Sequence, residues 1–295
     1  MSQTTKIEWA DATWSPIRAR VKQDAAELAR QKGYTSLIQI ATKMVGRVGQ
    51  HCELVSTGCK NCYSGNDNKR CLPGNGTGLP FDRRARDLVQ IFLDEKKLTE
   101  PLHWRKPKKI FVENQSDLFG EWVMDERIGI IDRVFDVMSQ CPLHSFQILT
   151  KRPDRMRDFI SRLSACDQWP LPNLWLGVSV ESRAVLDRID ILRQIPAAIH
   201  FISFEPLLED LGPVDLTGID WIIIGGESGP GARKCDLGWI LSLVVQAKAL
   251  GVACFMKQLG AKPFDLGVRL KLRHRKGGDP DEWPADLRVR EFPAR

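Results

Sequence analysis

The chain has 295 residues, of which 43% are hydrophobic and 27% charged, and a formal net charge of +6. This length allows one large hydrophobic core or two smaller ones, and the composition is that of an ordinary soluble globular protein. No apolar run approaches the roughly 20 residues that span a bilayer, and nothing resembles a signal peptide. We therefore expect a cytoplasmic protein without a membrane partner, whose cysteines stay reduced.

Two tryptophans, Trp9 and Trp14, stand in the polar first part of the chain. Large aromatic side chains in such a setting predict a segment that docks on the protein body. Residues 21–32 are rich in Ala, Leu, Glu, Arg and Lys, which predicts a helix that ends at Gly33. Residues 34–48 are of mixed character, and we expect one strand there, just before the first cysteines.

The segment HCELVSTGCKNCY places Cys52, Cys59 and Cys62 in a C-x6-C-x2-C pattern. Cysteines separated by two residues often nucleate a metal site, because a tight turn aims both sulfurs the same way. Three thiolates can hold an iron–sulfur cluster and leave one iron open for chemistry. Two alternatives stay open: Cys71 as a fourth ligand would close a structural zinc site, or the thiols have an ordinary or redox role. The remaining cysteines are predicted to be core residues: Cys141, Cys166, Cys235 and Cys254.

After a loop rich in Gly, Pro and Asn over residues 72–81, short apolar runs alternate with stretches of helical periodicity. The predicted strands are 109–112, 146–149, 174–180, 199–204, 221–224 and 252–256. The predicted helices are 126–139, 154–163, 183–193 and 239–250. Repetition of strand and helix indicates a parallel sheet. With one more strand before the cysteines, the pattern favours an α/β fold of the (β/α) TIM-like barrel type, complete or incomplete, over an open doubly wound sheet.

Polar residues follow each predicted strand, at the ends that would ring one mouth of a barrel, where active sites lie. They are Ser116, Asp117, Thr150, Lys151, Arg152, Ser179, Glu181, Glu205, Glu227, Ser228, Lys257 and Gln258. The candidates for catalysis are the charged side chains Lys151, Glu205, Glu227 and Lys257. The nearby stretch IIIGGESGPGAR lacks the spacing of a dinucleotide or P-loop motif. Its Glu227 and Arg233 could flank a ligand carboxylate or phosphate, or pair with each other.

Basic residues gather in three clusters, which raises a nucleic acid as a candidate partner, although solvated faces or helix ends explain any single cluster equally well. The clusters are Arg83, Arg84 and Arg86; Arg105, Lys106, Lys108 and Lys109; and Lys271, Arg273, His274, Arg275 and Lys276.

The predicted organisation has three parts. Residues 1–50 form an N-terminal extension, residues 51–260 a barrel that carries the cysteine loop, and residues 261–295 a C-terminal extension. The last part is too polar and too interrupted by proline for another barrel unit. Trp283 and Phe292 are expected to pin it against the protein body.

Nine stretches carry a family resemblance: IEWADATW, STGCKNCY, KIFVENQSDLF, FQILTKRPDRM, WLGVSVE, FISFEPLL, DWIIIGGESGPGAR, FMKQLG and DEWPADLRVREFP. Together they resemble a phage and prophage protein family of unknown function, the phage gp-thirty-seven/gp-sixty-eight family, which is grouped with radical-SAM-like barrels. The resemblance covers nearly the whole chain. Residues 17–50 depart from the family pattern and look like an insertion.

The resemblance implies a [4Fe–4S] cluster on Cys52, Cys59 and Cys62. In radical SAM enzymes, S-adenosylmethionine chelates the open iron through its amino and carboxylate groups, and electron transfer cleaves its sulfonium to a deoxyadenosyl radical. The usual spacing is C-x3-C-x2-C, whereas six residues fill the first gap here. By position, the expected contacts of S-adenosylmethionine are Ser116 and Asp117 with the amino group, and Ser179 and Glu181 with the ribose.

The leading expectation is therefore an iron–sulfur enzyme of radical-SAM type that modifies or repairs a nucleic acid or a nucleotide. A second hypothesis keeps the cluster as an electron relay in a redox or photochemical repair protein that does not use S-adenosylmethionine. A third is a zinc-stabilised barrel that binds nucleic acid without catalysis.

Overall fold

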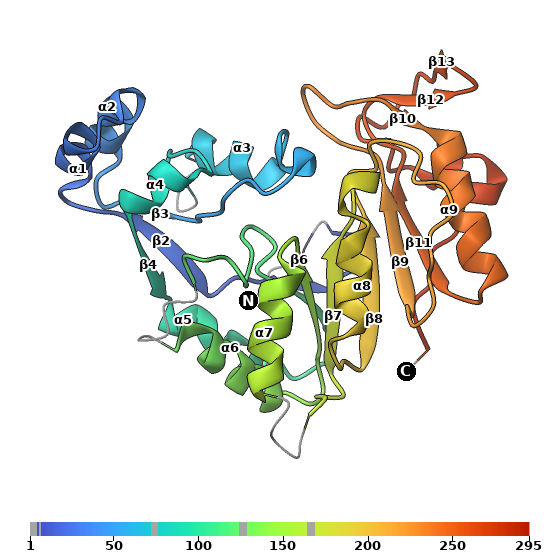
Figure 1. The fold of residues 1–295 in the computed structure, drawn as a ribbon, viewed down its shortest axis with the longest axis horizontal. Coiled ribbons are helices and arrows are strands. Elements are labelled where there is room, and N and C mark those ends of the chain that lie inside the picture. The colour runs from blue at the N-terminus through green and yellow to red at the C-terminus, as the bar shows by residue number, and fades with distance from the viewer. Residues whose placement is uncertain (1–4, 6, 72–75, 124–128, 164–168, 295) are drawn as a thin grey trace. The chain divides into compact units, whose positions relative to one another are not determined.

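The computed structural model describes residues 5, 7–71, 76–123, 129–163 and 169–294 (Figure 1). The chain divides into two compact units. Within the described residues, unit 1 comprises Ala12–His144, and unit 2 comprises Thr5–Asp11 together with residues 145–294. The boundary between the units follows His144, and the predicted organisation in three parts stays a prediction.

Unit 2 is built on five strands that pair in parallel in the order β6-β7-β8-β9-β11. The strands are β6 (Ser145–Thr150), β7 (Leu174–Ser179), β8 (Ile199–Phe204), β9 (Trp221–Gly225) and β11 (Ala253–Gln258). The helical segments between them are α7 (Pro153–Leu163), η3 (Arg183–Val185), α8 (Asp187–Arg193) and α9 (Leu237–Ala249). Every residue of β7 and β9 is buried, as expected where both faces of a parallel sheet are covered. The strand and helix predictions for this unit are confirmed.

The core of unit 2 centres on Trp221, whose side chain is fully buried. Its ring lies 6.0 Å from that of Trp9 and 5.8 Å from that of Trp175, both edge-on. The predicted docking of the first segment is thus confirmed for Trp9, which is 2% exposed.

The C-terminal segment, residues 261–294, packs against the rest of unit 2. It contains β12 (Pro263–Asp265), β13 (Val268–Arg269), η4 (Pro280–Glu282) and η5 (Ala285–Leu287). Strand β10 (Cys235–Asp236), which precedes α9, pairs in parallel with β12. The backbone N–H of Met256 donates to the carbonyl of Val289 and that of Glu291 to the carbonyl of Cys254, both at 2.8 Å, so the chain covers the edge strand β11. Trp283 is buried and the Phe292 ring stacks on Trp221 at 5.3 Å, which confirms that both residues pin this segment.

Unit 1 contains one parallel pair, β1 (Ala12–Trp14) with β5 (Lys109–Val112), and a small antiparallel sheet. In that sheet β2 (Ile17–Val21) lies between β3 (Val48–Gly49) and β4 (Val89–Leu93). The helices are α1 (Ala25–Gln31), α2 (Thr35–Met44), η1 (Thr57–Cys59), α3 (Tyr63–Arg70), α4 (Arg83–Asp87), α5 (Glu95–Leu98), η2 (Glu100–His103) and α6 (Ile130–Ser139).

The insertion 17–50 folds as β2-α1-α2-β3 and shares a core with β4. Much of that core is alanine, which lets the two helices lie close to the strands: Ala19, Ala25, Ala29 and Ala41 are all fully buried. The insertion is therefore a packed part of unit 1.

Several predictions for unit 1 are wrong. Val21 belongs to a strand, because the alternating segment 17–21 buries one face on the small core, and α1 begins only at Ala25. Residues 35–44 form a helix rather than mixed structure, with Leu37 and Ala41 buried at helical spacing. The strand expected just before the cysteines exists as β3, but it is antiparallel and does not belong to the parallel sheet. The parallel strand that precedes the cysteine loop is β1, before residues 17–50.

Further predictions concern the end of α1, the buried cysteines and the fold class. Gly33 ends α1 with a φ of +69°, as predicted. Cys141, Cys235 and Cys254 are buried, as predicted, while Cys166, residues 72–75 of the predicted loop and the start of the predicted helix at 126 lie outside the described residues. The mixed α/β class with parallel strands is confirmed, and closure into a barrel stays a prediction. Within the described residues, no helix combines the length and the apolar character of a membrane span.

Candidate functional site

The cysteine loop joins β3 to α3 in unit 1. Cys59 ends the short helix η1, and Cys62 is the residue that precedes α3. The backbone N–H of Cys62 donates to the carbonyl of Cys59 at 3.3 Å, which closes the tight turn that the two-residue spacing predicts. Cys52, Cys59 and Cys62 are all half-buried.

Three side-chain hydrogen bonds fasten this loop to the segment that follows β5. The Ser116 hydroxyl donates to the carbonyl of His51 at 2.6 Å, directly before Cys52. At the other side of the loop, the Tyr63 hydroxyl donates to the carbonyl of Asn114 at 2.5 Å, and the Ser64 hydroxyl to that of Gln115 at 2.6 Å. The loop is therefore held at the C-terminal end of a parallel strand, the position at which α/β folds place their ligands.

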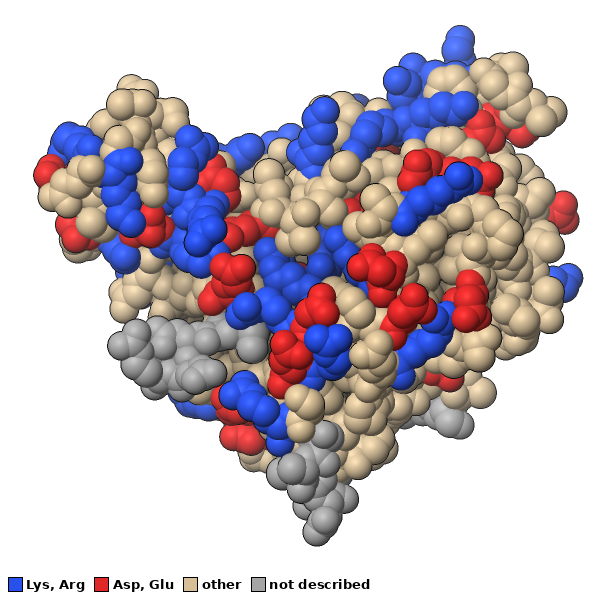
Figure 2. Space-filling view, in the orientation of Figure 1, with Lys and Arg blue, Asp and Glu red and all other residues tan. Residues whose placement is uncertain are grey.

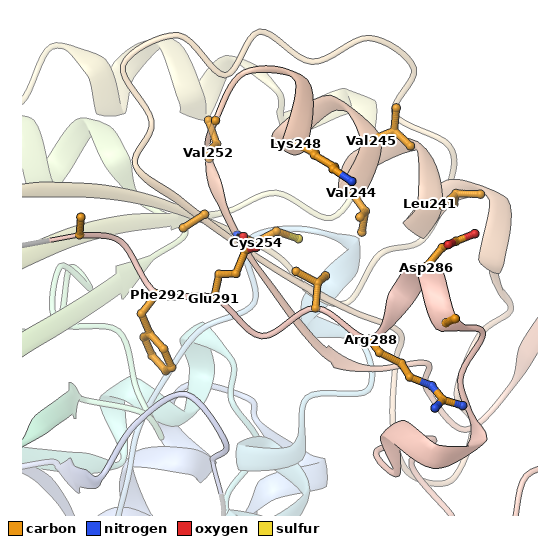
Figure 3. A pocket seen from close by; sticks show the side chains of 15 residues that line it. Leu241, Val244, Val245, Lys248, Val252, Cys254, Asp286, Arg288, Glu291 and Phe292 are labelled. Atoms are coloured by element: carbon orange, nitrogen blue, oxygen red, sulfur yellow. The ribbon is translucent and has the colours of Figure 1, made fainter.

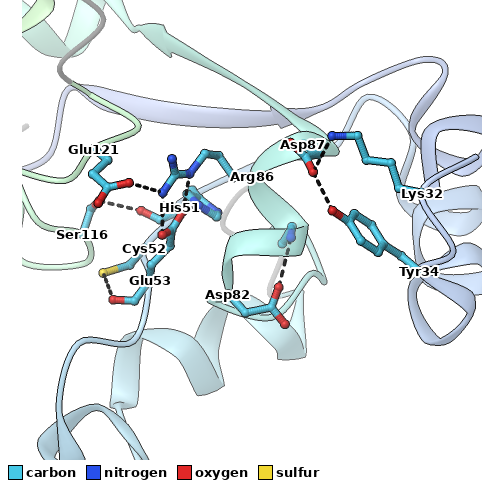
Figure 4. A network of polar contacts seen from close by, with 11 residues as sticks. Lys32, Tyr34, His51, Cys52, Glu53, Asp82, Arg86, Asp87, Ser116 and Glu121 are labelled. Atoms are coloured by element: carbon cyan, nitrogen blue, oxygen red, sulfur yellow. Dashed lines mark hydrogen bonds and ion pairs between the residues drawn. The ribbon is translucent and has the colours of Figure 1, made fainter.

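A charged network lies beside Cys52 (Figure 4). Glu53 accepts hydrogen bonds from Arg86, one of them at 2.6 Å, and Arg86 also donates to Glu121 at 2.9 Å. Burial raises the pKa of Glu53, but the hydrogen bonds from His51 and Arg86 lower it by a larger amount, so that the pKa falls to about 2. The hydrogen bond to Glu53 raises the pKa of Arg86, while burial lowers the pKa of His51. At neutral pH the network thus holds an ionised carboxylate, an ionised guanidinium and a neutral imidazole next to Cys52.

Cys71 lies at the opposite end of α3 from Cys62. It is the C-cap residue of that helix, with a φ of +50°, and its sulfur lies 3.7 Å from the sulfur of Met44 in α2. The helix axis rises by roughly 13 Å over the nine positions from Cys62 to Cys71, whereas two thiolates on one zinc ion lie only roughly 4 Å apart. Cys71 therefore cannot be a fourth ligand alongside Cys62 while α3 is formed, which counts against the four-thiolate zinc site.

The donor set fits a group that takes three protein thiolates, because all three cysteines lie in one loop and the fourth candidate is excluded. In this structure the sulfurs of Cys52, Cys59 and Cys62 do not converge on a common point. Among the described residues, no group of three or more His, Cys, Asp or Glu side chains lies close enough together to hold a metal ion. Binding of a cluster therefore requires the cysteine loop to rearrange so that its three sulfurs converge.

Ser116 and Asp117, the residues predicted to meet the amino group of S-adenosylmethionine, follow β5 beside the cysteine loop. The Ser116 hydroxyl proton is used by the bond to His51, and the Asp117 carboxylate accepts from the backbone N–H of Phe119 at 3.1 Å. Asp117 is 6% exposed. Both residues shape the segment that holds the loop, and their contact with a ligand stays a prediction.

Glu113 is the residue at this strand end that the sequence did not single out. It follows β5 with a φ of +51°, an unusual conformation for a residue with a side chain, and is 3% exposed. Its Oε1 accepts from the backbone N–H of Ile17 at 2.9 Å, whereas Oε2 has no hydrogen-bond partner among the described residues. Burial raises its pKa to about 8, although the Ile17 hydrogen bond and the charge of Arg18 oppose the rise.

Glu113→Gln is expected to change how stability depends on pH. Because the folded pKa of Glu113 is raised from 4.5 to about 8, the native state keeps a proton that the unfolded chain releases between these values. The proton on Glu113 thus contributes fully to the stability of the wild type below pH 4.5. This contribution is lost as pH rises to about 8, by up to about 1.4 kcal/mol per pH unit. Glutamine cannot ionise but keeps the acceptor for Ile17. The free energy of unfolding of the variant, minus that of the wild type, should rise on the order of 4 kcal/mol from pH 5 to 8.5 in urea titrations. Parallel pH profiles would contradict the raised pKa.

In unit 2, predicted catalytic residues meet at the ends of β8 and β11. The Lys257 ammonium donates to both carboxylate oxygens of Glu205 at 2.8 Å. Gln258 donates to Glu205 at 3.2 Å and to the carbonyl of Gly226 at 2.9 Å. Glu205 and Lys257 are both partly exposed, at 19% and 17% of the side chain, so a ligand can reach this pair.

Glu227 and Arg233 pair with each other, which is one of the two possibilities that the sequence left open. The Arg233 Nε donates to Glu227 at 2.9 Å and its backbone N–H at 2.8 Å. The glycines of this stretch allow close backbone approach: a Cβ on Gly226 would lie 2.2 Å from the carbonyl oxygen of Leu259. The stretch is therefore built to pack the loops after β9 and β11 against each other.

Glu181, predicted to contact a ribose with Ser179, is fully buried. Its carboxylate accepts from Arg188 at 3.1 Å, and the same guanidinium donates to the carbonyl of Ser179 at 2.7 Å. Arg188 is itself buried, so this ion pair closes the turn between β7 and α8. A ribose could reach Glu181 only if this part of unit 2 opened, and the ribose contact stays a prediction. The fourth catalytic candidate, Lys151, lies directly after β6 and is half-buried.

A cavity of about 950 Å³ lies between α9, the start of β11 and the C-terminal segment (Figure 3). Its lining includes Leu241, Val245, Arg288 and Phe292. Cys254 also lines it, but burial raises the pKa of this thiol to about 12, so it stays protonated at neutral pH. The cavity lies at the N-terminal end of β11, away from the strand ends that carry the predicted site residues, and we assign it no catalytic role.

A family described as "Protein of unknown function (DUF5131)" matches residues 41–282. The matched region contains the cysteine loop, β5 and all five parallel strands of unit 2, but only the last part of the insertion 17–50. No curated protein and no solved structure matched the chain. The resemblance to the phage family and to radical-SAM-like barrels stays a prediction.

Proposed function

The chain belongs to the DUF5131 family, and from this premise we propose that it is an iron–sulfur enzyme of radical-SAM type that acts on a nucleic acid. One observation carries the proposal. A loop with three half-buried thiols is fastened by Ser116, Tyr63 and Ser64 to the C-terminal end of a parallel strand, while Cys71 is held away by α3.

In this proposal Cys52, Cys59 and Cys62 hold a [4Fe–4S] cluster. When bound and reduced, such a cluster supplies the electron that cleaves the sulfonium of S-adenosylmethionine at its open iron. The chain's own residues position the loop. Ser116 fixes the backbone before Cys52, and Tyr63 and Ser64 fix it after Cys62, so that both ends of the loop are held while its thiols converge on the cluster. Glu53 and Arg86 keep opposite charges beside Cys52 without a net charge of their own.

The polar strand ends of unit 2 are proposed to contact the substrate. Glu205, Lys257 and Gln258 form a connected set at the ends of two strands that are partners of β9. Because Lys257 and Glu205 pair with each other, a substrate group that binds one of them leaves the other charged and available to accept or donate a proton.

S-adenosylmethionine cleavage tests the catalytic half of the proposal. Protein purified without oxygen and loaded with iron and sulfide should release 5′-deoxyadenosine when dithionite and S-adenosylmethionine are added, as measured by chromatography. The addition of S-adenosylmethionine should also change the electron paramagnetic resonance signal of the reduced cluster, because the cofactor binds an open iron. A loaded cluster with neither response would exclude the radical-SAM type and leave the electron-relay hypothesis.

The three basic clusters differ in what they support. Arg86 of the first cluster pairs with Glu53 and Glu121, and Arg84 pairs with Asp82 at 2.7 Å, so these charges are used within unit 1. In the second, Lys108 lies over the ring of Trp104 at 5.6 Å. The third cluster is exposed throughout, and it supports the nucleic-acid partner best.

A further inference from the structure

The hairpin of β12 and β13 presents an unusual tip. Leu266 and Gly267 are the two residues between the strands, and both have positive φ, +46° and +82°. Such a turn favours Asn-Gly or Asp-Gly, because residues with bulky side chains are strained at positive φ. Leu266 is nevertheless 94% exposed, and the neighbouring Val268 is 67% exposed. Packing within unit 2 compensates neither the backbone strain at Leu266 nor the exposure of its apolar side chain.

The segment behind the tip is basic, and of its Lys and Arg side chains only Arg273 forms an ion pair within the described residues, with Glu282 at 3.6 Å. Arg269, Lys271, Arg275 and Lys276 are exposed, and none of them forms an ion pair with a carboxylate of the described residues. Figure 2 shows Lys and Arg side chains along the upper right edge, over the region where Figure 1 places β12 and β13. Asp265 lies opposite Val268 in the hairpin, so the tip itself is not basic. The apolar tip and the positive charge are therefore separate features of one arm, the segment 263–276.

The loop that carries these charges is held in place. Glu282 accepts from the backbone N–H of Arg273 at 2.6 Å and of His274 at 2.9 Å. The N–H of Gly260 donates to the carbonyl of Lys276 at 3.0 Å. An arm that is ordered before it binds loses less conformational entropy on binding.

We propose that the arm 263–276 binds duplex DNA, with Leu266 and Val268 wedged against the bases and the basic residues behind them on the phosphates. Architectural DNA-binding proteins insert Leu, Ile, Met or Phe between base steps in this way. Single-strand binding relies on aromatic platforms instead, and the exposed tip contains none. This inference rests on the nucleic-acid partner proposed above and is independent of the cluster.

The substitution Leu266→Asn removes the apolar wedge but is compatible with the conformation of the turn. Asparagine suits positive φ, so the melting temperature of this variant should be unchanged or higher. The affinity for a short duplex, measured by fluorescence anisotropy, should fall roughly 5- to 30-fold. A 2-aminopurine in the duplex should brighten when wild-type protein unstacks it, and should not respond to the variant. Wild-type affinity or unstacking in Leu266→Asn would overturn the proposal.

The salt dependence of binding tests the phosphate contacts separately. Lys271→Gln combined with Arg275→Gln should make the slope of log K against log salt less steep by roughly 1.8, since each phosphate contact contributes about 0.9. Lys248→Gln, which removes an exposed charge on α9 away from the arm, should leave the slope unchanged. An unchanged slope in the double variant, tighter binding to single-stranded than to duplex DNA, or preference for phosphatidylglycerol vesicles over the duplex would each refute the assignment.

The failure of this inference and that of the cluster can be told apart. Cys59→Ala protein without iron should bind the duplex like the wild type. Protein with a full complement of iron that does not bind the duplex would refute the arm and leave the cluster standing. Duplex binding by protein that takes up no iron would refute the cluster and leave the arm standing.

Discussion

Cys59→Ala is expected to abolish iron binding, whereas Cys71→Ala is expected to leave it at the wild-type level. Both cysteines are half-buried, so the two substitutions are matched in environment. They differ in position, because Cys59 lies in the turn before α3 and Cys71 is the C-cap residue at the far end of that helix. A cluster that loses one of three thiolates loses about a third of its protein ligands and the loop geometry that presents them.

The measurement is iron per chain after anaerobic reconstitution, with Cys52→Ala and Cys62→Ala expected to behave like Cys59→Ala. Circular dichroism of each variant controls for folding. Loss of metal in Cys71→Ala together with the other three would indicate a four-thiolate site, which requires that α3 unwind, and the three-ligand account would then be wrong.

Trp221→Ala is expected to destabilise unit 2 by about 3–5 kcal/mol. The fully buried ring contacts Trp9, Phe255 and Phe292, and its Nε1 donates to the carbonyl of Glu291 at 2.9 Å. Removal leaves a cavity and an unpaired carbonyl, a large loss beside the 5–15 kcal/mol that stabilises a typical domain. Urea denaturation gives the free energy of unfolding.

The same substitution should release the C-terminal segment. The Glu291 N–H, which bonds to Cys254, should exchange with deuterium faster than in the wild type. Trp239→Ala is the matched control: Trp239 is only half-buried on α9, and its loss should cost less than half as much. Equal costs for the two variants would show that Trp221 is not the centre of this core.

The parts of the fold that could be predicted are those whose pattern is local. Strands β6 to β9 have five or six residues each and are rich in large apolar side chains, so they can be recognised without their partners. β1 has three residues, carries no periodicity, and is defined only by its pairing with β5 far along the chain. Residues 17–50 are hard to predict from sequence because their core is largely alanine, which gives little hydrophobic contrast with the exposed face.

The candidate site also has features that the sequence predicts and features that it does not. Sequence position placed Glu205 and Lys257 correctly at strand ends, but nothing local revealed that they pair. The burial of Glu181 depends on its ion pair with Arg188, and nothing in the surrounding sequence sets Arg188 apart from the exposed arginines of the chain. Glu113 could not be found, because its positive φ and its hydrogen bond from the backbone N–H of Ile17, far away in the sequence, leave no local pattern.

Iron and acid-labile sulfide in wild-type protein, purified without oxygen, test the central claim most directly. The account predicts about four of each per chain and a broad absorption band in the visible blue. One zinc ion per chain, with no iron and no colour after reconstitution, would contradict it.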